Sequence, residues 1–302
     1  MSNERIGLQH EAIALIRQVI GTQRASEQLA GKRLVIKVGG STLASQRPIL
    51  EGCLWLQALG AQLVLVHGGG SSINAMLSRL HLPVQFKDGR RLTDAATLEI
   101  VRMVLCGQVN QGLVSLASSL GGKAVGLSGT DGQMIQACLI DPTLGFVGEI
   151  DAVSPDLLLA LLEHGYLPII APFGHGQDGM ILNINADAVA TALAQAIHAE
   201  MLLFLSDVAG LKRPDGSVIA SLSASEASQL IQERVIVSGM IPKVEAALRA
   251  VQTIPVVQVI DGARPQALLQ AALWHEGGTR FLSQDDSPDT KCVSHAKEQQ
   301  RR

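Results

Sequence analysis

Aromatic residues and cysteines are scarce in this sequence. Only 3 % of its 302 residues are aromatic, whereas 47 % are hydrophobic and 30 are glycine. Aliphatic packing with many glycines is more typical of an open α/β sheet than of a β sandwich. The four cysteines, Cys53, Cys106, Cys138 and Cys292, form no C-x-x-C pair. We therefore expect no structural zinc site, a reducing compartment and buried free thiols.

Features of nucleic-acid-binding and membrane proteins are also missing. The net charge is −3 and no basic stripe appears, so nothing favours a nucleic acid partner. No apolar run approaches the roughly 20 residues of a membrane span. The N-terminus, MSNERIGLQHE, carries both signs of charge and does not resemble a signal or transit peptide. We expect a cytoplasmic protein without a membrane partner.

Several enzyme signatures are absent as well. The sequence contains no G-x-x-x-x-G-K-[ST], H-E-x-x-H or G-x-S-x-G motif. These absences disfavour a Walker-type nucleotide site, a zinc protease and an α/β-hydrolase nucleophile.

What the sequence does contain is an alternation of aliphatic and amphipathic segments. Continuous aliphatic runs without polar alternation indicate strands covered on both faces, hence a parallel sheet between two helical layers. We expect an α/β fold, a three-layer αβα sandwich around an open, mainly parallel sheet, with a β-hairpin between Met134 and Val153. The predicted strands are 33–38, 62–67, 123–128, 167–172, 201–206, 256–261 and 279–282. The predicted helices are 75–80, 94–105, 155–165, 186–199, 226–232 and 243–251.

The two ends of the chain differ from this core. Residues 1–32 comprise an amphipathic helix, with apolar residues at helical spacing from Leu8 to Ile20, and a polar connector. The core domain is predicted over residues 33–282. Residues 283–302 are polar and poor in apolar side chains, so we expect a disordered tail.

Glycine-bearing turns follow the first two predicted strands. The first strand ends in Lys37, Gly39 and Gly40, and the second ends in His67 followed by three glycines that lead into a helix. In an open parallel sheet, ligands bind beyond the carboxyl ends of the strands, where such turns offer backbone N–H groups to an anion. We interpret His67 as a hydrogen-bonded structural residue.

Seven ordered blocks between Arg33 and Leu282 are similar to successive blocks of the amino acid kinase family: VIKVGGS, LVHGGG, DGRRLTDAATLEIVRMVLCGQVNQ, AVGLSGTDG, NINADAVATALA, LSDVAGL and GMIPKVEAAL. The resemblance is closest to members that phosphorylate the γ-carboxylate of N-acetyl-L-glutamate with ATP in arginine biosynthesis. It implies an acceptor-binding half, about residues 33–190, and an ATP-binding half, about residues 191–282.

The resemblance also implies roles for three charged residues. A carboxylate acceptor has a pKa of about 4.3 and is ionised near pH 7, so the reaction needs fixed positive charge rather than a general base. Lys37 resembles the lysine that contacts the phosphoryl group from the acceptor side. Lys243 resembles the lysine that stabilises the leaving ADP, and Asp187 resembles the carboxylate that orients both lysines.

For the acceptor, the resemblance implies backbone donors at Gly69 and Gly70 and a clamp on the α-carboxylate from Arg91. Arg90 is expected to point away, since adjacent residues of an extended segment face opposite sides. Asn183 resembles the amide that hydrogen-bonds the acetamido group or the α-carboxylate.

For the nucleotide, Mg²⁺ is expected to arrive with ATP and to be held by phosphates and water, without protein ligands. The nucleotide-binding residues implied by the resemblance are Gly39, Gly40, Asp207, Val208, Gly210, Leu211, Lys212, Val235, Ile236 and Val237.

The resemblance also bears on assembly and regulation. The family core implies a homodimer, and helix Leu8–Ile20 resembles the helix through which some members form hexamers. Gln258, Gln266 and Ala271 stand where arginine-inhibited members have histidines and a glutamate, so feedback by arginine is not expected.

Two alternatives stay open. One is a related kinase that acts on a carrier-bound aminoadipate or glutamate, although we find no basic docking patch for a carrier. The other is a silent homologue that senses an amino acid, which the retention of Lys37, Asp187 and Lys243 disfavours.

Overall fold

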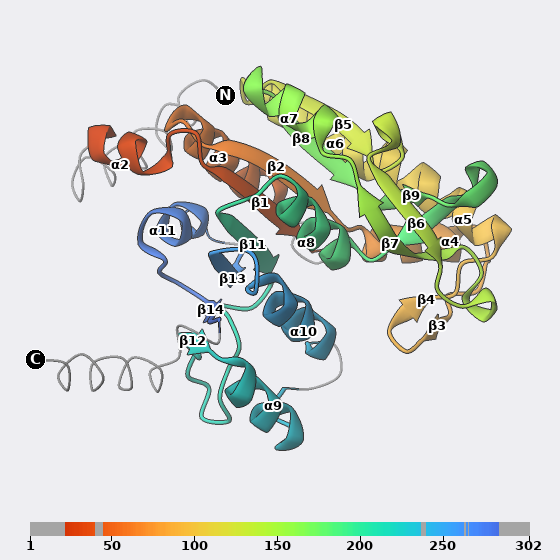
Figure 1. Cartoon of the computed structure of the whole chain (residues 1–302). Helices are drawn as coiled ribbons and strands as arrows, with labels where there is room; N and C mark the ends of the chain where they lie inside the picture. Colours follow the sequence, from red (N-terminus) through yellow and green to blue (C-terminus); the bar gives the residue numbers. More distant parts are fainter. Residues whose placement is uncertain (1–21, 40–44, 237–239, 263, 265, 284–302) are drawn as a thin grey trace, which may run out of the picture.

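The computed structural model describes residues 22–39, 45–236, 240–262, 264 and 266–283, and centres on an eight-stranded sheet (Figure 1). The strand order is β12-β14-β13-β11-β1-β2-β8-β5, and every neighbouring pair is parallel except β13 and β14. The predicted mainly parallel sheet is confirmed. The strands are β1 (Arg33–Val38), β2 (Gln62–His67), β5 (Ala124–Ser128), β8 (Leu167–Ala171), β11 (Met201–Ser206), β12 (Ser221–Leu222), β13 (Val256–Asp261) and β14 (Thr279–Phe281).

Helices cover both faces of the sheet and complete the predicted three layers. One layer holds α2 (Thr22–Leu29), α3 (Gln46–Ala58), α4 (Gly70–Arg79), α5 (Ala95–Arg102), the π-helical segment Met103–Asn110, α6 (Gln111–Ser119) and α11 (Ala267–Trp274). The other holds α7 (Asp156–Glu163), α8 (Ala186–Ala196), α9 (Ala224–Gln232) and α10 (Ile241–Ala250).

Strand β1 shows how the two core clusters are separated. Leu34, Ile36 and Val38 pack in the first core cluster, which lies under α3 and α11. Val35 packs in the second core cluster, which lies under α8 and α10. Side chains alternate along a strand, so Lys37 emerges on the α8 and α10 side. This placement directs the one lysine of β1 toward those two helices.

A small closed barrel and a short hairpin stand apart from the main sheet. The barrel comprises β6 (Ile135–Leu139), β7 (Val147–Val153), β9 (Phe173–His175) and β10 (Ile181–Ile184). Strands β6 and β7 are antiparallel, which confirms the predicted hairpin. The separate hairpin joins β3 (Phe86–Lys87) to β4 (Arg90–Arg91).

Two expectations about local structure were wrong. The segment predicted as a polar connector forms α2, because Ala25 and Leu29 of this polar helix bury completely against the core. Cys53 is a buried thiol as expected, and burial raises its pKa to about 12, but Cys138 lies exposed on β6. The predicted helix Leu8–Ile20, Cys292 and the tail from residue 284 lie outside the described residues.

The longest helix of the described chain runs from Ala95 to Ser119 through α5, the π-helical segment and α6. By length and composition it could cross a membrane, contrary to the expectation that no segment is apolar and long enough. Core helices pass the same test, and Val101, Leu105 and Leu113 of this helix are buried in the first core cluster. It serves here as a core helix.

Candidate active site

An ion pair stands at the carboxyl end of β1. Lys37 is 7 % exposed, and its Nζ lies 2.6 Å from Oδ1 of Asp187. Asp187 belongs to the first turn of α8, where Asn185 caps the helix by accepting from the Asp187 and Ala188 N–H groups. The capped helix N-terminus favours a carboxylate at this position. Sheet and helix therefore fix the two charges against each other.

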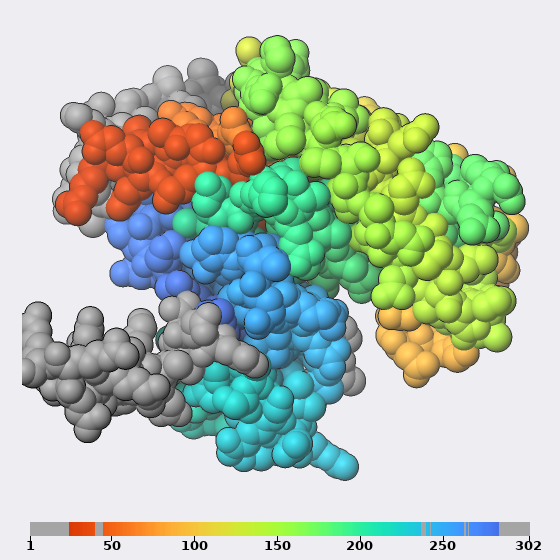
Figure 2. All heavy atoms as spheres, viewed as in Figure 1, coloured from red at the N-terminus to blue at the C-terminus, as the bar shows by residue number. Residues whose placement is uncertain are grey.

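Lys243 lies in the first turn of α10, which packs beside α8 (Figure 2, blue beside green). Burial lowers the pKa of Lys243, and the positive charge of Lys37 lowers it further. The carboxylates of Asp187 and Asp207 oppose that shift. Charges act on one another in this way only at short range. Lys37 and Asp187 are thus in direct contact, and Lys243 is near enough to feel the charges of Lys37, Asp187 and Asp207.

The glycine turn after β2 lies next to the end of β1. The Gly68 N–H donates to the Val38 carbonyl over 2.9 Å. A Cβ at Gly69 would stand 2.4 Å from Cδ2 of Leu105, so any larger residue there would have to displace the Leu105 side chain of the long helix. Gly70 begins α4 and is exposed. Gly39 follows β1 and is half-buried, and Gly40 lies outside the described residues.

His67 is fully buried at the end of β2, with Nδ1 2.8 Å from the Gly68 carbonyl and Nε2 3.1 Å from the Asn110 amide nitrogen. Burial lowers its pKa to about 4, so the ring is neutral at pH 7. The interpretation of His67 as a hydrogen-bonded structural residue is confirmed.

Arg91 is buried on β4, whereas its neighbour Arg90 is exposed, as the alternation predicted. Nη2 of Arg91 donates to Oδ1 of Asn74 and to the Gly70 carbonyl, and the guanidinium lies 4.7 Å from the centroid of the Phe86 ring. Nη1 is buried without a hydrogen-bond partner among the described residues. Burial lowers the pKa of Arg91 from its ordinary value. Nη2 of this desolvated guanidinium is thus held by hydrogen bonds, whereas Nη1 is not.

Thr93 links Asn183 to Arg91. The Asn183 amide on β10 donates to Oγ1 of Thr93 over 3.3 Å, and that hydroxyl donates to the Arg91 carbonyl over 2.8 Å. The structure therefore gathers the predicted acceptor residues around the start of α4 and β4. Sequence reasoning missed Asn74 and Thr93. The only sequence signal for Asn74 was its position one helical turn after Gly70, and the only signal for Thr93 was its position two residues after Arg91, on the same face of an extended segment.

The predicted nucleotide segments follow β11 and α9. Strand β11 pairs with β1, and Asp207 follows it directly. Asp207 is exposed and Val208 is half-buried. Gly210 has φ 138°, and the Leu211 N–H donates to Oγ1 of Thr279 over 2.9 Å. Lys212 is exposed and Val235 is half-buried.

Leu211 and Ile236 are both buried in the second core cluster, so their side chains are core and not open surface. Val237 lies outside the described residues.

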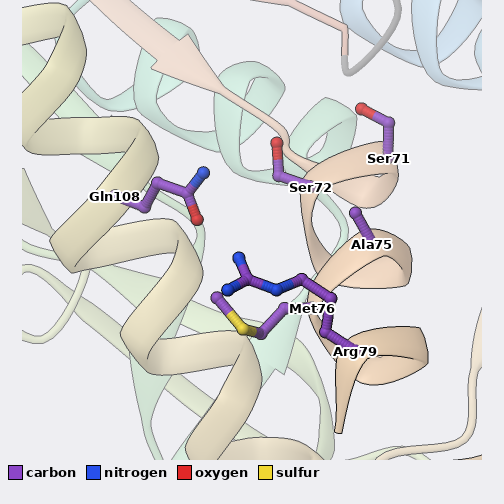
Figure 3. A pocket seen from close by; sticks show the side chains of 6 residues that line it. All are labelled: Ser71, Ser72, Ala75, Met76, Arg79 and Gln108. Carbon is purple, nitrogen blue, oxygen red and sulfur yellow. The ribbon is translucent and has the colours of Figure 1, made fainter. Parts of the chain in front are cut away.

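A pocket of about 310 Å³ lies between α4 and the π-helical segment (Figure 3). Ser71, Ser72, Ala75, Met76, Arg79 and Gln108 line it, and none of the predicted site residues does. Across the described ranges, His, Cys, Asp and Glu side chains do not gather in groups of three or more that could hold a metal ion.

Comparisons with known proteins agree with the sequence resemblance. A model of the amino acid kinase family matches residues 32–260. Acetylglutamate kinase from Syntrophomonas wolfei is 42 % identical over 264 residues, covering 84 % of this chain and 92 % of the relative. The chloroplastic acetylglutamate kinase of Arabidopsis thaliana is 40 % identical over 266 residues, covering 85 % and 77 %.

A solved structure shares the fold. The N-acetylglutamate synthase of Neisseria gonorrhoeae, in complex with coenzyme A and N-acetyl-glutamate, matches with a TM-score of 0.77 and 25 % identity, covering 87 % of this chain and 62 % of that chain. Family model, relatives and fold coincide, and the chain is an enzyme of the amino acid kinase family.

Proposed function

We propose that this enzyme transfers the γ-phosphoryl group of ATP to the γ-carboxylate of N-acetyl-L-glutamate, forming an acyl phosphate in arginine biosynthesis. Relatives of about 40 % identity carry the name acetylglutamate kinase. The observation that carries the proposal is the Lys37–Asp187 ion pair, with Lys243 close enough for its pKa to respond to both charges.

Two lysines suit the electrostatics of this transfer. The acceptor carboxylate is already an anion, so the barrier includes the repulsion between it and the triphosphate. Lys37 would meet the transferred phosphoryl group from the acceptor side, and Lys243 would stabilise the charge on the leaving ADP. Asp187 would hold both ammonium groups in place without taking up a proton. The cap by Asn185 supports this role, because it fixes the backbone of Asp187, whose carboxylate is paired with Lys37.

The acceptor would bind between α4, β4 and β10. The buried, unpartnered Nη1 of Arg91 suits an α-carboxylate, because a guanidinium can donate to two oxygens in one plane. Asn183 would donate to the acetamido group or to the same carboxylate. The Gly69 and Gly70 N–H groups at the start of α4 would hold the reacting end of the acid.

ATP would lie across the carboxyl end of β11. The proposed binding segments are 207–212 and 235–237, together with Gly39 and Gly40 after β1. Mg²⁺, carried by the phosphates, would neutralise part of their charge, and its strong hydration favours phosphate and water oxygens over protein ligands. The desolvated ammonium of Lys243 suits the phosphate chain, since burial strengthens an ion's electrostatic interactions.

The proposal extends to assembly and location. We expect a cytoplasmic homo-oligomer. A dimer needs only the family core, whereas a hexamer depends on helix Leu8–Ile20, outside the described residues.

A turnover assay tests the function directly. Enzyme, ATP and Mg²⁺ are incubated with N-acetyl-L-glutamate and hydroxylamine, which converts an acyl phosphate to a coloured hydroxamate. We expect hydroxamate in proportion to ADP. The same assay with glutamate, aspartate and aminoadipate identifies the acceptor. Saturable amino acid binding without hydroxamate from any acid would contradict the proposal and favour the sensor, and turnover only with a carrier-bound substrate would favour the carrier kinase.

A further inference from the structure

Two buried polar residues that the proposed chemistry does not use meet behind the glycine turn. His67 is 0 % exposed and Asn110 is 2 % exposed. The Gly68 carbonyl can only accept, so the 2.8 Å contact requires a hydrogen on Nδ1 of His67. The neutral ring then presents Nε2 as an acceptor to the Asn110 amide, 3.1 Å away. The tautomer of His67 is fixed from both sides.

Asn110 is itself held firmly. It is the last residue of the π-helical segment, and its amide nitrogen donates one hydrogen to the Ile169 carbonyl on β8 over 2.8 Å. The other hydrogen is shared between Nε2 of His67 and the Leu127 carbonyl on β5, 3.3 Å away. Gly126 leaves room for it, because a Cβ there would stand 2.1 Å from Oδ1 of Asn110. A flipped amide would place its oxygen against carbonyl oxygens, so only one orientation is satisfied.

This arrangement holds two consecutive peptide planes of the glycine turn, that between His67 and Gly68 and that between Gly68 and Gly69. The Gly68 N–H is bonded to the Val38 carbonyl, and the Gly68 carbonyl is bonded to His67. In a trans peptide the C=O and the following N–H point in opposite directions. Holding the Gly68 carbonyl inward on His67 therefore directs the Gly69 N–H outward, away from the core. Glycine lacks a side chain that would restrict this peptide, so the constraint must come from elsewhere.

We propose that His67 and Asn110 are positioning residues that orient the Gly69 N–H toward the acceptor carboxylate. The inference rests on the proposed function, in which Gly69 binds the acceptor. Asn110 holds the imidazole of His67, the imidazole holds the Gly68 carbonyl, and the resulting peptide orientation prepares the donor before the acceptor arrives. Such preorganisation improves acceptor binding without touching the nucleotide.

His67→Leu and His67→Asn separate positioning from packing. Leucine fills the space but cannot donate, whereas the asparagine amide nitrogen occupies the place of Nδ1 and can donate to the Gly68 carbonyl. Loss of an oriented hydrogen bond to an anion should raise the acceptor KM about tenfold in His67→Leu, with the KM for ATP within about twofold. His67→Asn should restore most of the loss. His164→Leu is the matched control, because His164 also contacts a backbone carbonyl, over 2.8 Å, but is exposed.

A second variant and a direct measurement cover the case in which His67→Leu fails to fold. Asn110→Ala keeps the imidazole donor but releases the ring, and should raise the acceptor KM severalfold. In [15N]glycine-labelled protein, the Gly69 amide resonance should move in His67→Leu or Asn110→Ala and return in His67→Asn. An unmoved resonance, an unchanged acceptor KM in a folded variant, or equal increases in both KM values would overturn the inference. Absence of wild-type turnover would instead contradict the proposed function and leave the resonance as the test.

Discussion

Replacing Lys37 by methionine removes one charge from the ion pair and keeps the length of the side chain. In the structure, Nζ of Lys37 lies 2.6 Å from Asp187, and both side chains are mostly buried, at 9 % and 17 % exposure. If Lys37 stabilises the transferred phosphoryl group, its loss should cost about 3 kcal/mol of transition-state stabilisation, a fall in kcat of a hundredfold or more. The KM for ATP should change little.

The effect on folding should be smaller. Breaking a fully buried pair costs about 3–5 kcal/mol, because the remaining charge is left without a partner. Asp187 is not left alone here, since Lys243 already responds to its charge, and it keeps some contact with water. We therefore expect Lys37→Met to lower the free energy of unfolding by only about 2 kcal/mol, between the values for buried and exposed pairs. The pKa of Lys243 should rise, because a neighbouring positive charge is gone.

Three measurements check this reasoning. The hydroxamate assay gives kcat and both KM values, urea unfolding gives the stability, and NMR of the lysine side-chain amines follows the Lys243 titration. Lys123→Met is the control, because Lys123 is exposed just before β5. A folded Lys37→Met enzyme with kcat within threefold of wild type would refute the catalytic assignment of Lys37. An unchanged Lys243 pKa would refute the proximity of the two lysines.

Further predictions concern the acceptor and the turn. Arg91→Ala should raise the acceptor KM in the hydroxamate assay tenfold to a hundredfold, the effect of losing about 1.5–3 kcal/mol in a hydrogen bond to a charge. Arg90→Ala, at the exposed neighbouring position, should leave this KM unchanged. The folded-state pKa of His67, about 4, lies below its ordinary 6.5, so its stabilisation is complete above pH 6.5 and is lost as the pH falls toward 4. Unfolding curves should therefore lose about 2 kcal/mol from this group between pH 7 and pH 5, a loss absent in His67→Leu. Gly69→Ala should lower the melting temperature, because its Cβ would meet Leu105; equal melting temperatures would contradict that close approach.

Most of the sheet could be predicted because its strands carry an unambiguous signal. Runs such as 33–38, 62–67 and 201–206 are aliphatic on both faces, and the observed strands have the same bounds. Helix α2 was missed because its segment is mostly polar, and its few apolar residues become significant only once α11 is in place beside it. Helical periodicity also predicted the start of the long helix, but it carries no mark of the π-helical turns.

The site was predicted unevenly for a physical reason. Lys37, Asp187 and Arg91 stand in recognisable blocks, and the structure supplies their separation and burial. Asn74 and Asn110 are single polar residues on helices, a pattern that usually indicates a solvated face. Only the fold reveals that one holds a guanidinium and the other holds an imidazole. Hydrogen-bond partners such as these are brought together by tertiary packing, which the local sequence pattern does not encode.

Strand β1 is flanked by β2 on one side and by β11 on the other, although Met201 follows Arg33 by more than half the chain. During synthesis β1 and β2 leave the ribosome long before β11 exists. The nascent chain must therefore carry an unpaired, strongly apolar strand edge until Met201–Ser206 emerges, and such edges attract other chains. Chaperone occupancy on ribosomes should peak over this interval and fall once β11 has been translated.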